Sequence, residues 1–186
     1  VTVVEGAFTA QAFITTDLDD NQITAFHPGA MEFSHHNRLP DMEGIRIGMV
    51  SPDGREGMLQ HANQFVEAGI PFIFDPGQGM PMFDGSSLSH FIDQAAWVTV
   101  NDYEWQLMQE RTGLSPHDIT ERVEALIITR GGNGSVIYVQ DKRYEVPAAT
   151  PRAVEDPTGC GDAYRAGLLY GLLNQLDWET TGRIAS

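Results

Sequence analysis

The sequence predicts an α/β fold: a doubly wound, mainly parallel sheet with helices on both faces, accompanied by a small β lid. Two observations support this fold class. From residue 45 onward, short apolar runs alternate with longer segments that carry helical caps and stops, a repetition typical of parallel sheets. Before that point, the β-forming stretches 11–16 and 22–26 are joined by Asp and Asn residues that favour a tight turn, which predicts a hairpin.

The first strand and helix after the hairpin follow from local signals. The apolar run 45–50 predicts a strand. The helix after it is expected to have Ser51 as its N-cap, Pro52 in its first turn and Gly69 as its stop, because these residue types are favoured at those positions. Together these signals predict the first β-then-α unit.

The rest of the chain repeats this pattern. Each predicted strand is an apolar run, and the predicted helices begin at capping residues or end at glycines. The predicted elements are a strand at 70–75, a helix end and strand at 93–101, helices at 101–113 and 115–125, a strand at 126–132, a hairpin of 134–140 and 143–147, and a last helix at 162–176.

Length and charge narrow the class of protein. The chain has 186 residues, enough for one sizeable core, and no run approaches the ~18 apolar residues of a membrane span. Its formal net charge of −15 argues against a broad nucleic-acid or anionic-membrane surface, which would need clustered Lys and Arg. Positive charge must therefore be local.

Two residue counts restrict the chemistry further. Lys142 is the only lysine and sits in a predicted turn, so a phosphate would be held by arginine or by backbone amides. Cys160 is the only cysteine and cannot form an internal disulfide, which favours a reducing compartment, and we expect the cytoplasm. Neither end carries the signs of a natural terminus, so the chain is expected to be internal to a longer protein.

Polar residues stand at the ends of three predicted strands. Asp75, Asn101 and Thr129, with Arg130 after it, occur where apolar runs end. Ligands of open α/β sheets bind beyond the carboxyl ends of the strands, so these residues are expected at one ligand-binding edge. Helix capping or turn formation is an equal alternative for Asp75 and Asn101 taken singly.

The segment EDPTGCGDAYRAG, residues 155–167, is the strongest chemical signal in the chain. A glycine-rich turn that runs into a helix leaves backbone N–H groups unpaired at the positive end of the helix dipole, which predicts an anion site without lysine. Gly159 and Gly161 permit a left-handed turn and the close approach of a phosphate. Gly167 and Gly171 are instead expected to let the helix pack closely on a neighbour.

Asp162 has two explanations. As an N-cap it would accept a hydrogen bond from a helix N–H group. A carboxylate beside an anion-binding loop can instead accept the proton of an attacking hydroxyl while a phosphoryl group leaves its nucleotide, and the loop amides would stabilise the developing charge. The second explanation accounts for both the loop and the carboxylate.

Cys160 also has two explanations. It could be a thiol nucleophile activated at a helix N-terminus, or a small residue required by the tight turn.

Other site types are disfavoured by the residues present. The lysine loop G-x-x-x-x-G-K-[ST] is absent, and Tyr164 stands where a dinucleotide fingerprint requires glycine. His35 and His36 are adjacent, so their side chains diverge, and no cysteine lies near them, which argues against a structural metal site.

Three spaced motifs resemble the ribokinase-like, or PfkB, carbohydrate kinases. DPTGCGD at 156–162, followed by AYRAG, resembles the carboxy-terminal signature of that family. NDYE at 101–104 is similar to its Asn-x-x-Glu motif, and TRGGNG at 129–134 is similar to its Thr-x-Gly-x-x-Gly nucleotide segment. Residues 12–31 resemble its lid strands and the Pro-Gly-Ala turn that follows them. The chain looks like an internal-to-C-terminal fragment of such an enzyme.

The resemblance implies a phosphoryl-transfer site in the carboxy-terminal loop. Asp162 would be the catalytic base toward a hydroxyl group of the substrate. Asp156 and Thr158 match positions that hold a monovalent cation, usually potassium, in many members. The anion hole would be formed by the backbone amides of Gly159, Cys160 and Gly161.

The resemblance also implies a site for ATP and Mg²⁺. Asn101 and Glu104 would organise the metal and the phosphates, with Glu104 acting largely through water. Residues 1–30 would form part of a β lid and its return strand, and residues 31–186 an α/β nucleotide-binding and catalytic domain, incomplete at both ends. The nucleotide would be flanked by Thr129, Gly131 and Gly134.

The acceptor implied by the resemblance is a hydroxymethyl group of a nucleoside, with adenosine favoured, because NQITAFHPGAM, FDPGQGMPMF and GDAYRAG are most similar to the nucleoside kinases of the family. A ribose- or fructose-type sugar is the alternative, as is a non-catalytic nucleotide-binding regulatory module. A homodimer through strand pairing of the lid is a further expectation. Base stacking and core packing are equal alternatives for Phe13, Met80, Met82 and Phe83.

Overall fold

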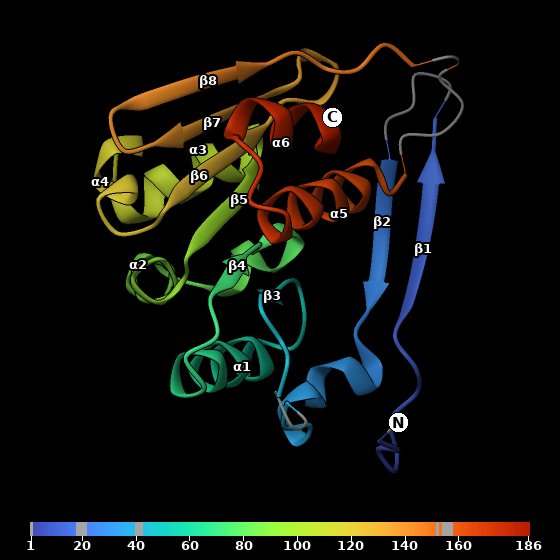
Figure 1. Ribbon diagram of the computed structural model, residues 1–186. Helices are drawn as coiled ribbons and strands as arrows, with labels where there is room; N and C mark the ends of the chain where they lie inside the picture. The colour runs from blue at the N-terminus through green and yellow to red at the C-terminus, as the bar shows by residue number, and fades with distance from the viewer. Residues whose placement is uncertain (1, 18–21, 40–42, 152, 154–157) are drawn as a thin grey trace.

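The computed structural model describes residues 2–17, 22–39, 43–151, 153 and 158–186 (Figure 1). The predicted hairpin is confirmed. Strands β1 (Gln11–Thr16) and β2 (Gln22–His27) pair antiparallel and form a two-stranded sheet of their own. Figure 1 shows this hairpin standing to the right of the α/β part of the chain.

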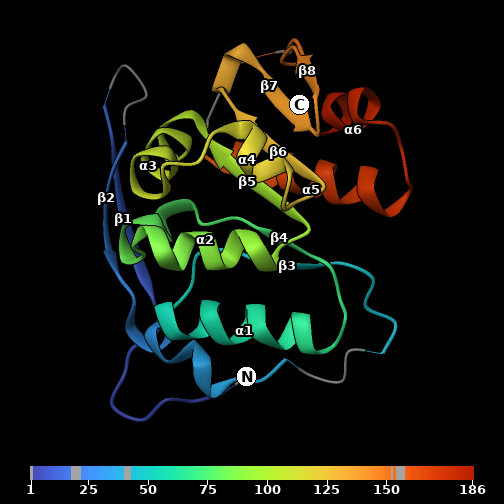
Figure 2. The same cartoon turned by 90° about the vertical axis from the view of Figure 1, so that its left-hand side faces the viewer.

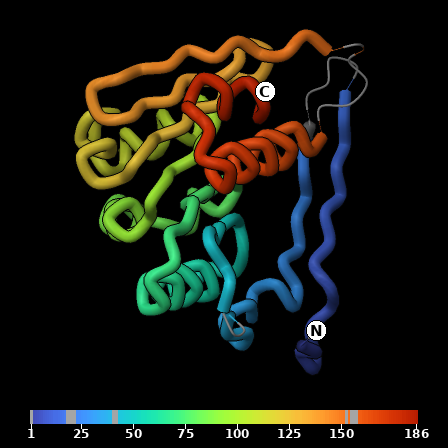
Figure 3. Tube along the Cα trace, in the orientation of Figure 1, coloured from blue at the N-terminus to red at the C-terminus, as the bar shows by residue number. Residues whose placement is uncertain are grey.

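The main sheet has six strands, arranged side by side in the order in which they occur in the chain. The first four are parallel and the last two are antiparallel, so the sheet is mainly parallel as predicted. In Figure 3 the colour accordingly changes from cyan near the first strand to orange at the last. The strands are β3 (Gly48–Val50), β4 (Phe72–Phe74), β5 (Trp97–Asn101), β6 (Ala125–Thr129), β7 (Ser135–Val139) and β8 (Lys142–Val146).

Helices cover both faces of this sheet (Figure 2). Successive strand residues point to opposite faces, so Phe72 and Phe74 join one buried cluster and Ile73 joins the other. The first cluster is covered by α1 (Arg55–Glu67), α2 (Gly85–Gln94), α3 (Asp102–Thr112) and α4 (Pro116–Thr120), and the second by α5 (Cys160–Leu173) and α6 (Trp178–Ala185).

The predicted start of α1 is wrong. The helix begins at Arg55 with Gly54 as its N-cap, and Ser51 lies before it. The Ser51 hydroxyl donates instead to the carboxylate of Asp75, at 3.0 Å. The side chain expected to cap the helix therefore forms a tertiary hydrogen bond. The predicted stop is confirmed, because Gly69 adopts a left-handed φ of +67° just after the helix. The strand before the helix is also shorter than predicted, since β3 begins only at Gly48.

The last part of the chain contains a helix that the sequence did not predict. Helix α6 begins after Asp177, whose side chain accepts the N–H of Thr180 at 2.9 Å. It packs on α5, where Gly167 and Gly171 leave no room for a side chain against the facing helix. The packing role predicted for these two glycines is therefore confirmed. The predicted helix 115–125 is shorter, since α4 ends at Thr120.

Three short 3-10 segments join the larger elements: η1 (Gly29–His36), η2 (Gly77–Met82) and η3 (Gly131–Asn133). Within the described ranges, none of the helices has both the length and the apolar character that crossing a membrane requires.

Candidate active site at the carboxyl edge of the sheet

The polar residues predicted at the strand ends do lie along one edge. Asn101 is the last residue of β5 and pairs in register with Thr129, the last residue of β6. Asp75 directly follows β4, and its N–H donates to the carbonyl of Val50 in β3 at 2.9 Å. Because these strands are parallel, their carboxyl ends meet at the edge where ligands of such sheets bind.

Asn101 and Glu104 form a reciprocal capping box at the start of α3. The Asn101 side chain accepts the N–H of Glu104 at 2.7 Å, and the Glu104 carboxylate accepts the N–H of Asn101 at 2.8 Å. The capping role considered for Asn101 is thus confirmed. Burial raises the pKa of Glu104, and this is partly offset by the Asn101 N–H and by the Arg165 guanidinium nearby. A carboxylate held in this way has a defined position at the sheet edge.

Helix α5 begins with the predicted anion loop. Its N-cap is Gly159, in the left-handed conformation with a φ of +82°, and the next residues are Cys160, Gly161 and Asp162. The first N–H groups of a helix have no partner within it, and the space beside the Gly159 α-carbon is open. The start of α5 therefore fits an anion such as a phosphate group. Cys160 is exposed at the same place.

Asp162 is not the N-cap, because Gly159 occupies that position and Asp162 is the third residue of the helix. This removes the capping explanation. Its side chain is 79% exposed and pairs with the Arg165 guanidinium, one turn further along the helix, with Nη2 and Oδ1 2.5 Å apart. Arg165 also bonds Asp75, since its Nε lies 3.0 Å from Oδ2 of that residue.

Asp75 is a buried carboxylate rather than a cap or a turn former. It is 1% exposed, and the Ser51 hydroxyl and the Arg165 guanidinium both donate to it. Burial raises its pKa to about 6, and this effect outweighs the lowering by Arg165 and Ser51. The negative charges of Glu104 and Asp162 raise the pKa further, which shows that all these groups share one electrostatic environment.

The predicted nucleotide segment begins at the end of β6, where Thr129 pairs in register with Asn101 of β5. Gly131 has a left-handed φ of +52°, and the space beside its α-carbon is open. Gly134 also has a positive φ, and a side chain there would collide with the backbone of Val146, Pro147 and Ala148, so close packing already requires a glycine at this position. Arg130 turns toward Glu145 on β8, with Nη2 and Oε2 3.6 Å apart.

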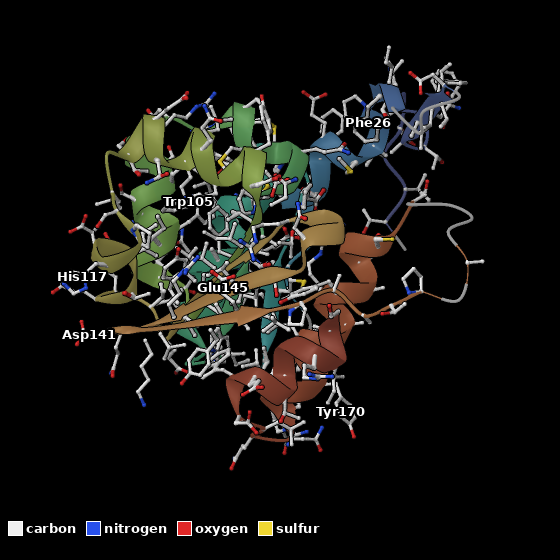
Figure 4. The ribbon with its side chains drawn as sticks, turned by 90° about the horizontal axis from the view of Figure 1, so that it is seen from above. Phe26, Trp105, His117, Asp141, Glu145 and Tyr170 are labelled. Atoms are coloured by element: carbon white, nitrogen blue, oxygen red, sulfur yellow. The ribbon has the colours of Figure 1, made fainter. Side chains whose placement is uncertain are left out.

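A large cavity opens along the same edge, at the carboxyl ends of β3 and β4. It measures about 930 Å³ and lies between the hairpin, η1, α1 and η2. Figure 4 shows Phe26 of β2 on the side of the hairpin that faces the α/β part. Met82 lines the cavity, whereas Met80 and Phe83 are each 1% exposed and belong to the core. Other lining residues include Pro28, Met31, Pro52, Gln78 and Gly79.

The structure thus brings together most of the predicted site residues, and it adds Arg165, Ser51 and this cavity. Asp156 lies outside the described residues, so its pairing with Thr158 stays a prediction. The only local signal for Arg165 was its spacing of three residues from Asp162 on one helix. No group of three or more His, Cys, Asp or Glu side chains able to hold a metal occurs within the described residues.

Comparisons with known proteins agree with this fold. The model of the "pfkB family carbohydrate kinase" matches residues 1–186. The nucleoside kinase of Methanocaldococcus jannaschii is 36% identical over 179 residues, which cover 96% of this chain and 58% of that protein. The structure of Burkholderia thailandensis nucleoside kinase in complex with inosine is similar with a TM-score of 0.94 at 53% identity, over 97% of this chain and 61% of that one.

A ribokinase from Thermotoga maritima shares the fold at 20% identity, with a TM-score of 0.75 over 96% of this chain and 61% of that one. The chain therefore spans about three fifths of the length of the proteins it resembles. Because the family model covers every residue, the chain belongs to the pfkB family of carbohydrate kinases.

Proposed function

We propose that the protein transfers the terminal phosphoryl group of ATP to the hydroxymethyl group of a nucleoside, with adenosine as the favoured acceptor. The observation that carries this proposal is the first turn of α5, where the Asp162 carboxylate lies beside helix N–H groups at the ligand-binding edge of the sheet. Two relatives named as nucleoside kinases support the acceptor class, and one of them has a structure in complex with ADP-inosine.

In this proposal Asp162 accepts the proton of the attacking hydroxyl. Its exposed carboxylate is free to meet a substrate, and its place in the third position of α5 sets it next to the loop amides. ATP, when bound, supplies the phosphoryl group. The negative charge that develops on that group is stabilised by the helix dipole and by the N–H groups of Gly159, Cys160 and Gly161.

The nucleotide phosphates and Mg²⁺ are proposed to lie near Asn101 and Glu104. Both side chains already use an oxygen in the capping box, so Glu104 would reach a metal through water. Mg²⁺ in phosphoryl-transfer sites keeps several waters and binds mainly phosphates, which fits the finding that the described residues form no dedicated metal cluster. Thr129, Gly131 and Gly134 would flank the nucleotide. Asp156 and Thr158 are proposed for a potassium ion on the family resemblance alone.

The nucleoside base is proposed to occupy the cavity beside the hairpin. Phe26 and Met82 give the cavity apolar contacts, and small-molecule pockets are typically lined in this way with a few polar groups. Residues 1–30 would then act as a lid over the acceptor, and residues 31–186 would bind the nucleotide and carry Asp162, the proposed catalytic base. A free ribose- or fructose-type sugar has no flat apolar ring to use these contacts, so it is the second candidate.

Assay of the full-length protein with ATP and Mg²⁺ tests the proposal. We expect phosphoryl transfer to adenosine and inosine to exceed transfer to ribose and fructose, and we expect Asp162→Asn to lower it by about 100- to 10,000-fold. Faster transfer to a sugar would identify that sugar, and not a nucleoside, as the acceptor. Nucleotide binding without transfer to any acceptor would favour a regulatory module, and an Asp162→Asn variant with full activity would refute the mechanism.

The hairpin also supports a proposed homodimer. Its apolar side chains are exposed on both faces: Phe13 (65%) and Ile23 (77%) on one face, and Ile14 and Phe26 (48% each) on the other. Such strands are covered in many proteins by pairing with a second copy. Sedimentation of the full-length protein at several concentrations would show a dimer, and Ile23→Lys should weaken it. We also propose a cytoplasmic location, because the free thiol of Cys160 is exposed.

A further inference from the structure

Arg165 connects two carboxylates, one buried and one exposed to solvent. Its Nε lies 3.0 Å from the buried Asp75 carboxylate, and its Nη2 lies 2.5 Å from the exposed carboxylate of Asp162. A guanidinium is planar and presents its donors in a fixed fork, so a group bonded through two of its nitrogens has little freedom to turn. The two carboxylates are therefore held at a fixed distance and angle from each other.

The Asp75 end of this contact is the anchor. Asp75 is 1% exposed, and its backbone N–H and carboxylate are bonded to Val50 and Ser51 respectively. A buried carboxylate without a cationic partner is costly, so the Arg165 bond is difficult to release. The Arg165 side chain is itself only 26% exposed.

The Asp162 end of this contact is exposed to solvent. Its side chain is 79% exposed, and among the described residues its only hydrogen bond and its only ion pair are those to Arg165. A free surface carboxylate samples several rotamers, and that freedom must be lost when it meets a reacting group. The Arg165 guanidinium also lies against the anion loop, because a side chain at Gly161 would approach its Nη1 to 3.3 Å.

We propose that Arg165 is a positioning residue: anchored on buried Asp75, it holds the Asp162 carboxylate in the orientation from which it accepts a proton. The bond uses Oδ1 of Asp162 and so leaves the other oxygen for the substrate. The charge of Asp75 offsets that of the guanidinium, so Asp162 is oriented without facing an uncompensated cation. This inference rests on the proposed function, since it assigns a purpose to Asp162 as a base.

The test uses the full-length protein with ATP, Mg²⁺ and adenosine. Misplacement of a reacting group by about 1 Å lowers rates by about 100-fold, so we expect Arg165→Gln to lower kcat by about 10- to 100-fold. Because Arg165 acts through Asp162 and not on the nucleotide, the KM for ATP should stay within about twofold. In an Asp162→Asn background, adding Arg165→Gln should change the residual rate by less than about twofold, since no base remains to be positioned.

A matched control is Arg122→Gln, which breaks an ion pair with Asp93 of 3.2 Å on the surface and should leave kcat unchanged. Arg165→Gln leaves Asp75 buried without its cation, so it is expected to unfold more easily. The double variant Asp75→Asn/Arg165→Gln removes both charges, and it should fold and show the same loss of kcat. If the single variant does not fold, the double variant carries the kinetic test.

Two results would overturn the inference. A wild-type kcat in the folded double variant would remove the positioning role. A further tenfold fall in the Asp162→Asn background, together with a raised KM for ATP, would show that Arg165 binds phosphate instead. Crystal structures of wild type and the double variant give a readout that does not depend on activity: the Asp162 carboxylate should be rotated or spread over several conformers in the variant, and an unchanged orientation would contradict the proposal. Absence of phosphoryl transfer in wild type would refute the proposed function itself, which separates the two failures.

Discussion

Replacing Asp75 by asparagine should change how the stability of the protein depends on pH. Burial raises the pKa of this carboxyl from 3.8 to about 6 in the folded protein. Between these pH values the folded protein binds more protons than the unfolded chain, so the free energy of unfolding falls as the pH rises from about 4 to about 6. A shift of about two pKa units, at about 1.36 kcal/mol per unit, gives a loss of about 3 kcal/mol.

Urea unfolding of the full-length protein, measured in steps from about pH 4 to about pH 7, tests this value. Asp75→Asn has no proton to lose, so its stability relative to wild type should improve by up to about 3 kcal/mol over that range. The variant also loses the ion pair with Arg165 at pH values where Asp75 is ionised in wild type, so the test compares pH slopes and not absolute stabilities. Asp93→Asn is the matched surface control, with the same change of charge at an exposed site. Equal pH slopes for wild type and Asp75→Asn would refute the reasoning.

Three further changes test the packing and the loop. Tyr164→Phe removes the hydroxyl that donates to buried Ser135 at 2.8 Å, so urea unfolding should show a loss of about 1–3 kcal/mol, and an unchanged midpoint would contradict this. Gly171→Val places a side chain where Thr181 of α6 already lies, so overpacking should cost about 1–3 kcal/mol and lower the melting temperature by several degrees. Cys160→Ala should retain the proposed phosphoryl transfer within about threefold, because Asp162, the proposed base, and the loop amides remain; complete loss in a folded variant would favour a thiol nucleophile.

The predictable parts of the fold are those where local chemistry and tertiary packing agree. Gly113 was expected to stop a helix, and it follows α3 with a left-handed φ of +71°. Ser115 was expected to cap the next helix, and it forms a reciprocal capping box with Asp118. In both places the neighbouring residues alone determine the backbone.

The parts that the sequence did not reveal depend on residues far apart in the chain. Ser51 before Pro52 has the local pattern of a helix start, but the hydroxyl bonds Asp75 across the sheet edge. Helix α6 contains Gly182, a poor helix former, which is explained only by its contact with Val146 of β8. Tertiary contacts override local preference at these positions.

The same reasoning applies to the site. The spacing of Asp162 and Arg165 is visible in the sequence, but the anchoring of Arg165 on Asp75 requires α5 to lie over the end of β4, and only the fold shows this. The cavity is a second example, because its walls come from the hairpin, from η1 and from the segments that follow β3 and β4. No single stretch of the sequence therefore predicts the cavity.

Asp75 links the two halves of the proposed site. On one side it bonds Ser51, which directly precedes Pro52 of the cavity wall, and on the other it bonds Arg165, which contacts Asp162. One buried carboxylate at the sheet edge therefore connects the cavity wall to the proposed base. In the proposed function, the acceptor must reach from the cavity to α5 to present its hydroxyl. A nucleoside meets this requirement if its base occupies the cavity, because the hydroxymethyl group then lies at the opposite end of the ribose.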